Sequence, residues 1–283
     1  MSTRQVTIGK QRSDFTGGTA EADYAAYTPP VILGSVYGGG QDGHVRRDTK
    51  ITMYSGEIGL PYNSANQSLL QTDNLDSPLW LHRGNIYGAG SGITEYKFDF
   101  NGDGKIQTEG EVTVADGMKY AEQGYSTSSG SVTRFTEVNV LGGTVHRNVY
   151  GGGSMGSVGA PNINQGYEPY KPGQANIDGK PENGPGRQSQ NTVNIGGGTT
   201  MVTIGTPFDS TRGWTYNKLY GGEVYGACRG MSSLNPEKFA NSVWTLVNIK
   251  DKATIMGNVY GGGDNGIVKK DSEVKVGEEK VQP

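Results

Sequence analysis

The segment 99–111, DFNGDGKIQTEGE, carries the most specific signal for chemistry in this sequence. Its candidate metal ligands are Asp99, Asn101, Asp103, Lys105, Glu109 and Glu111. The first three stand at positions 1, 3 and 5 of an EF-hand-type loop, and the fourth stands at position 7, where the ligand is the backbone carbonyl. Position 12 is a glycine, so one of the flanking glutamates must replace the usual bidentate glutamate. We expect this loop to bind Ca²⁺, and the alternative is a solvated Asp-Gly turn.

Acidic side chains elsewhere do not form a catalytic pattern that the sequence can define. A polysaccharide lyase or hydrolase needs two carboxylates, or a carboxylate and a base, at a fixed separation. The candidates are Asp48, Glu57, Glu137 and Asp251. Each stands at an outward-facing strand or turn position, where ordinary surface charge explains it. The sequence therefore favours a protein without catalytic activity.

Five copies of a Val-Tyr-Gly motif repeat along the chain at irregular spacing. They are GSVYGGG (34–40), GNIYGAG (84–90), RNVYGGG (147–153), GEVYGAC (222–228) and GNVYGGG (257–263). Strand-like runs of the type Thr-x-Val-x-Ile flank them, as in TEVNV (136–140) and TLVNI (245–249). In the fourth copy Cys228 takes the place of the third glycine, where we expect a small residue packed at a corner.

These repeats predict an all-β fold in which identical strands stack on one another. Each run is too short to be stable alone, but strands from successive repeats can form continuous parallel sheets around one core. We therefore predict a single-stranded parallel β-solenoid, a right-handed β-helix with loop excursions, over residues 1–283. A β-sandwich is the alternative, because it also consists of many short strands joined by turns.

The repeated tyrosines would form a column if the repeats stack in register. They are Tyr37, Tyr87, Tyr150, Tyr225 and Tyr260. An aromatic column stabilises a stack of strands mainly through packing. If its rings were exposed, the column would also be a flat platform for sugar rings, so these residues are candidate ligand contacts.

Insertions account for the irregular spacing of the repeats. We expect them at residues 60–80, 91–130, 160–189 and 229–243. Three of the four follow a Val-Tyr-Gly corner, so they would emerge on one side of the stack, often the binding side of a solenoid. Within the last insertion, NPEKFANS (235–242) predicts one short helix with a proline in its first turn.

Composition limits the remaining possibilities. Glycine contributes 47 of the 283 residues, and the net charge is −3, which gives no general attraction to nucleic acids or acidic membranes. No apolar stretch is long enough to span a bilayer. The first residues lack the apolar core of a signal peptide and already read as a strand, so we expect a fragment of a longer exported repeat array.

The five corner motifs and their flanking strands resemble the large repetitive adhesin-like surface proteins of Gram-negative gut bacteria. This resemblance implies β-helical repeats and a location outside the cell or on its surface. Our leading hypothesis is a protein without catalytic activity whose corner loops bind a glycan, a surface protein or a neighbouring subunit. The open ends of the stack carry unpaired backbone groups, so they also allow end-to-end self-association. A polysaccharide lyase or hydrolase, and a carbohydrate-binding module stabilised by calcium, are the alternatives.

Overall fold

The computed structural model describes residues 3–60, 84–92, 128–159, 189–207, 222–230 and 236–277. Short strands dominate these residues, and they form three large parallel sheets and one small one. Residues 99–111, which contain the candidate calcium ligands, lie outside the described residues. No helix among the described residues is long and apolar enough to cross a membrane.

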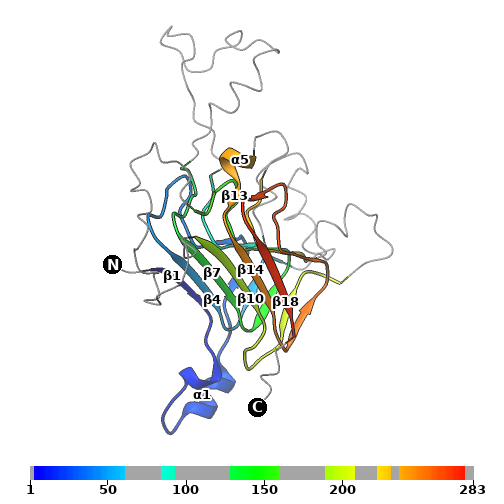
Figure 1. The fold of residues 1–283 in the computed structure, drawn as a ribbon. Helices are drawn as coiled ribbons and strands as arrows, with labels where there is room; N and C mark the ends of the chain where they lie inside the picture. The colour runs from blue at the N-terminus through cyan, green and yellow to red at the C-terminus, as the bar shows by residue number, and fades with distance from the viewer. Residues whose placement is uncertain are drawn as a thin grey trace, which may run out of the picture.

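Sheet 1 is the longest stack and faces the viewer in Figure 1, where its strands lie side by side in chain order from blue to red. Its strands are β1 (Arg4–Ile8), β4 (Thr49–Met53), β7 (Phe135–Val140), β10 (Gln190–Ile195), β14 (Thr245–Ile249) and β18 (Ser272–Val276). They are the Thr-x-Val-x-Ile runs of the sequence. All five pairings in this sheet are parallel and in register.

Sheets 2 and 3 are built from shorter strands that follow the first five strands of sheet 1. Sheet 2 contains β2 (Val31–Ile32), β5 (Glu57–Ile58), β8 (Gly143–Val145), β11 (Val202–Ile204) and β15 (Ala253–Ile255). Sheet 3 contains the Val-Tyr motifs as β3 (Val36–Tyr37), β6 (Ile86–Tyr87), β9 (Val149–Tyr150), β12 (Val224–Tyr225) and β16 (Val259–Tyr260). The chain thus visits sheets 1, 2 and 3 in the same order five times before it enters β18.

The small sheet 4 pairs β13 (Asn241–Ser242) with β17 (Ile267–Val268). Isolated parallel bridges extend the same row through Val45, Val132 and Val158. Every strand pairing among the described residues is parallel. The expectation of an all-β fold with parallel sheets is confirmed, and the antiparallel packing usual in a β-sandwich is not observed in this part of the chain.

The core lies between the three large sheets and repeats with the strands. In sheet 1 two rows of side chains point inward. The first row is Val6, Ile51, Val138, Val193, Val247 and Val274, and the second row is Ile8, Met53, Val140, Ile195, Ile249 and Val276. The middle members of both rows are fully buried. At the last strand, Val274 is 42% exposed and Val276 is 75% exposed, because no described strand covers β18.

Two short α-helices lie among the described residues. The helix α5 (Pro236–Phe239) confirms the predicted helix but ends earlier than expected, because Asn241 and Ser242 pair with sheet 4 instead. The helix α1 (Ala20–Ala26) has no counterpart among the elements predicted from the sequence; it follows a 3₁₀ turn at Arg12–Asp14 and projects below the sheets in Figure 1. The ring of Phe15, which lies between the 3₁₀ turn and α1, packs against the rings of Tyr24 and Tyr27.

Candidate functional site

The glycine after each repeated tyrosine allows neighbouring repeats to approach closely. A Cβ atom on Gly88 would lie 2.1 Å from the carbonyl oxygen of Gly151, and one on Gly151 would lie 2.2 Å from that of Gly226. The same contact recurs at Gly38 and at Gly226. No side chain fits at these separations, so the spacing of the repeats requires glycine at this position.

In three strands of sheet 1, a threonine near the start of the strand donates to the carbonyl group of one of these glycines. The hydroxyl of Thr49 donates to the carbonyl oxygen of Gly88 at 2.6 Å, and Thr136 makes the same bond to Gly151. Thr245 repeats it to Gly261 at 2.6 Å. Sheets 1 and 3 are therefore joined at the corner by a recurring hydrogen bond, and this explains why the strand motif begins with threonine.

The five repeated tyrosines form one continuous column of stacked rings. Successive centroids, from Tyr37 through Tyr87, Tyr150 and Tyr225 to Tyr260, are separated by 4.9, 4.8, 4.9 and 5.0 Å. The ring planes deviate from parallel by no more than 13°. The predicted column is present, and its spacing is that of adjacent β-strands.

The column does not expose its ring faces as a sugar platform would. The three inner rings, Tyr87, Tyr150 and Tyr225, are buried, and each has a neighbouring ring on both faces. Only Tyr260, at one end, is substantially exposed, at 41%. The packing role of the column is therefore directly visible, whereas stacking of a sugar on the inner rings would require the column to separate.

A row of polar residues precedes the tyrosines and links the repeats through their backbone. The hydroxyl of Ser35 accepts from the N–H of Asn85 at 3.0 Å, Asn85 Oδ1 accepts from the N–H of Asn148 at 3.0 Å, and Asn148 Oδ1 accepts from the N–H of Glu223 at 2.9 Å. Asn258 Nδ2 then donates to Glu223 Oε1 at 3.4 Å. Sequence reasoning missed this row, although the recurring polar residue before Val-Tyr or Ile-Tyr was a usable signal.

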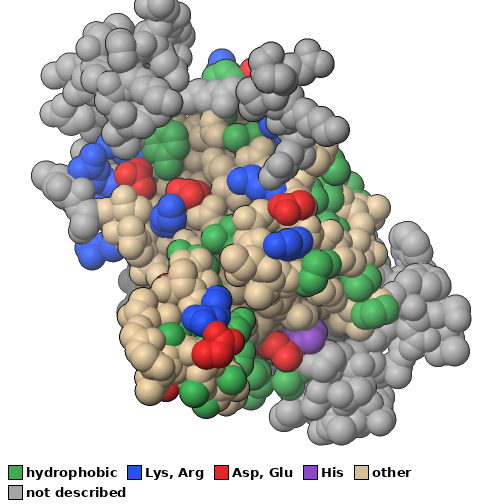
Figure 2. All heavy atoms as spheres, turned by 90° about the horizontal axis from the view of Figure 1, so that it is seen from below, with side chains coloured by type: hydrophobic (Ala, Val, Ile, Leu, Met, Phe, Trp, Pro, Cys, Tyr) green, Lys and Arg blue, Asp and Glu red, His purple; other side chains and the backbone are tan. Residues whose placement is uncertain are grey.

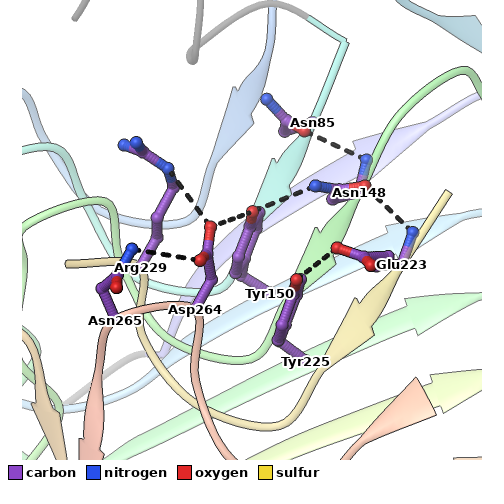
Figure 3. A network of polar contacts seen from close by, with 8 residues as sticks. All are labelled: Asn85, Asn148, Tyr150, Glu223, Tyr225, Arg229, Asp264 and Asn265. Carbon is purple, nitrogen blue, oxygen red and sulfur yellow. Dashed lines mark hydrogen bonds and ion pairs between the residues drawn. The ribbon is translucent and has the colours of Figure 1, made fainter. Parts of the chain in front are cut away.

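The hydroxyl of Tyr150 connects this row to a charged pair at the corner, as Figure 3 shows. Asn148 Nδ2 donates to the hydroxyl of Tyr150 at 3.1 Å, and that hydroxyl donates to Asp264 Oδ2 at 3.4 Å. Arg229 Nε lies 3.7 Å from the same carboxylate oxygen. The hydroxyl of Tyr225 donates to the carboxylate of Glu223.

Burial controls the protonation of the column. Loss of hydration raises the pKa of Tyr37 and Tyr87, and it raises the pKa of Tyr150 well above its ordinary value. The pKa of Tyr225 is also raised, first by burial and then by the neighbouring Tyr150 and Glu223. A tyrosinate has no favourable place in this column, so the rings act as neutral packing groups and hydrogen-bond donors.

Alkaline pH is expected to unfold the protein cooperatively. The folded-state pKa of these tyrosines lies above the unfolded value of about 10, so their stabilising effect is complete below about pH 10 and is lost as the pH rises further. Each such tyrosine lowers the free energy of unfolding by about 1.4 kcal/mol per pH unit in that range. Urea unfolding followed by circular dichroism from about pH 8 to pH 11 measures this slope. A midpoint that stays constant above about pH 10 would contradict a buried column.

The candidate carboxylates are distributed over separate structural contacts. Glu137 Oε1 accepts from Lys50 Nζ at 3.0 Å and from Asn139 Nδ2 at 2.8 Å. Glu57 Oε2 pairs with His146 Nε2 at 2.9 Å, and Asp48 Oδ1 accepts from the N–H of Phe135 at 3.3 Å. Each of these three carboxylates thus has a partner that explains its presence without a catalytic role.

The remaining sequence candidates divide into one packed residue and one loop without a described structure. Cys228 is buried at the corner, its Sγ lies 3.3 Å from the carbonyl oxygens of Gly156 and Asn241, and burial raises the pKa of its thiol. The predicted role of a small packed residue is confirmed. The candidate ligands of the 99–111 loop lie outside the described ranges, and within those ranges no group of three or more His, Cys, Asp or Glu side chains could hold a metal ion.

Comparisons with protein-family models, curated proteins and solved structures found no match to this chain.

Proposed function

We propose that the chain is a right-handed parallel β-solenoid from an adhesin-like or structural surface protein, without catalytic activity. One observation carries the proposal: sheets 1, 2 and 3 each receive one strand in turn, five times in succession, with every pairing parallel and in register. Connections between parallel strands are right-handed in about 98% of cases, which favours that hand. Such a stack suits an extended, rigid support rather than a deep catalytic cleft.

The binding function is assigned to the corner that follows sheet 3. Gly92 and Gly230, which precede segments 93–127 and 231–235, directly follow the row that contains Ser91 and Arg229. Gly159, which precedes segment 160–188, follows Val158 in the row of sheet 4, at the next corner. Loops that leave equivalent corners of a solenoid emerge on one side of it. We assign glycan or surface-protein binding, and an extracellular or cell-surface location, on this ground and on the resemblance of the motifs.

Surface charge is consistent with a neutral or weakly charged partner. Basic and acidic side chains are interspersed over the face shown in Figure 2. The net charge of the sequence is −3. A surface of mixed sign gives little general attraction to polyanions, so a nucleic acid is not the proposed partner.

A glycan array probed with the purified 283-residue chain tests this function, with a second assay for release of reducing ends from polysaccharides. We expect binding to one class of glycan and no release of reducing ends. Release of reducing ends would favour the lyase or hydrolase alternative. Binding to no glycan and to no surface protein would contradict the adhesin-like function.

We also propose that the 99–111 loop binds Ca²⁺ and that this ion stabilises the chain. If Ca²⁺ stabilises the chain, addition of EDTA will lower its melting temperature, and addition of excess Ca²⁺ will restore it. The variant Asp99→Asn with Asp103→Asn should no longer respond to either reagent. An unchanged melting temperature of the unmodified chain in EDTA would contradict stabilisation by Ca²⁺.

The exposed apolar ends of the stack support end-to-end self-association. Val274, Val276 and Tyr260 are exposed at one end, and Val31 and Leu33 are each 55% exposed at the other. Unpaired strand edges beside apolar side chains can join to another copy. Sedimentation velocity should show assembly that increases with concentration and is reduced by Val276→Lys. A monomer at all concentrations would exclude this contact.

A further inference from the structure

The corner after sheet 3 contains one basic side chain in an otherwise neutral and acidic row. Parallel bridges join Gln41, Ser91, Ser154, Arg229 and Asp264 into this row, one residue from each repeat. The side chain of Arg229 is only 8% exposed. A cation this deeply buried requires partners for its charge and for its five N–H donors.

Arg229 has fewer partners than its guanidinium requires. Its Nε lies 3.7 Å from Asp264 Oδ2, which is longer than a hydrogen bond. The same carboxylate already accepts from Tyr150 at 3.4 Å and from Asn265 Nδ2 at 3.3 Å. Nη1 of Arg229 is buried and has no hydrogen-bond partner in the described part of the chain. At least one strong donor is therefore left without an acceptor.

Arg229 and Asp264 act on the tyrosine column with opposite sign. The positive charge of Arg229 opposes the rise in the pKa of Tyr37 and Tyr87 caused by burial, whereas at Tyr150 the charge of Asp264, which raises the pKa, has the larger effect. The donor that Asp264 leaves available is Nη1 of Arg229. The next residue in the row, Ser154, adds a buried hydroxyl. Asp264, whose side chain is 34% exposed, is the acidic group placed against Arg229 in this network, and Figure 3 shows it on the Nε side.

We propose that the Arg229 corner binds an oxyanion, with Nη1 of the guanidinium as its principal donor. A guanidinium matches the two oxygens of a carboxylate or phosphate through parallel N–H donors. The chemistry fits two sources, the carboxylate of an acidic sugar and a free inorganic oxyanion. The first source rests on the proposed glycan function and names its substrate class, whereas the second does not depend on that function.

Isothermal titration of the whole chain at constant ionic strength tests the site with three probes: galacturonate, inorganic phosphate and galactose. We expect an oxyanion to bind and galactose to bind at least tenfold more weakly. Arg229→Gln should weaken oxyanion binding at least tenfold. Arg134→Gln, which removes an equal charge from a half-buried arginine elsewhere, is the matched control and should leave binding within twofold.

The outcomes separate the site from the proposed function. Binding of galacturonate assigns the acidic-sugar source, and binding of phosphate alone assigns the inorganic source even if the glycan array is negative. Three results would overturn the oxyanion site. The first is equal binding of galacturonate and galactose without phosphate binding, and the second is no binding of any probe. The third is an equal loss of binding in Arg229→Gln and Arg134→Gln. If Arg229→Gln does not fold, Arg229→Lys is the second variant, because it keeps the charge but loses the planar donors. It should still weaken oxyanion binding. Unchanged binding in Arg229→Lys would also overturn the site.

Discussion

Replacement of Gly88 by alanine is expected to lower the free energy of unfolding by roughly 3 kcal/mol or more, because a single methyl group would force two repeats apart. The new Cβ atom would lie 2.1 Å from the carbonyl oxygen of Gly151 and 3.1 Å from Thr136 Cβ. That carbonyl also accepts the hydrogen bond from Thr136, so relief of the overlap would weaken the bond between sheets 1 and 3. Urea unfolding of the purified variant measures the loss.

Gly262→Ala is the matched control for this substitution. Gly262 also belongs to a Val-Tyr-Gly-Gly-Gly motif, but a Cβ atom there would meet no other atom within 4 Å. The second repeat and the fourth already carry alanine at the corresponding position, as Ala89 and Ala227. We expect a change of less than about 0.5 kcal/mol. A similar loss in both variants would show that chain flexibility, rather than the contact between repeats, explains the glycines.

Tyr150→Ala should lower the free energy of unfolding by about 3–5 kcal/mol, the range for removal of a large buried aromatic ring. Tyr150 is 2% exposed and stacks between Tyr87 and Tyr225 at 4.8 and 4.9 Å. Its loss would open a cavity in the middle of the column and leave Asn148 Nδ2 without its acceptor. Thermal and urea unfolding give the two measurements of this effect.

Tyr260→Ala provides the comparison at the end of the column. Its ring is 41% exposed and stacks on one described neighbour, Tyr225, so we expect less than half of the loss seen for Tyr150→Ala. Tyr150→Phe isolates the hydroxyl group and should cost about 1 kcal/mol, because it removes the bonds to Asn148 and Asp264 but keeps the ring. Equal losses at the middle and end of the column would contradict its cooperative packing.

Local repetition made the sheets and the tyrosine column predictable. The alternation in TEVNV and TLVNI correctly predicts the inward rows of sheet 1, because each strand has the same pattern and the same neighbours. The identical Val-Tyr-Gly motif likewise predicts that the tyrosines lie above one another. Where the chain repeats its residues, register follows from the sequence alone.

The charged corner could not be predicted in the same way. Arg229 and Asp264 occupy one row of the structure, but their counterparts in the other repeats, Gln41, Ser91 and Ser154, are uncharged. The pair depends on side chains that reach across neighbouring repeats, a property that the spacing of backbone motifs does not determine. The helix α1 was missed for a related reason, since its Ala-rich sequence lies outside every repeat.

Disulfide formation between Lys50→Cys and Glu137→Cys is the most direct measurement of the central claim, that successive repeats lie beside one another in parallel register. These positions are Cα partners in β4 and β7, and neighbouring strands lie about 4.8 Å apart, within reach of a disulfide. Mild oxidation should link this pair rapidly in the folded protein. Lys50→Cys with Glu273→Cys lies in the same row but four strands apart, about 19 Å, and should remain reduced. Failure of the first pair to link, or efficient linking of the second pair within a monomer, would contradict the stacked arrangement.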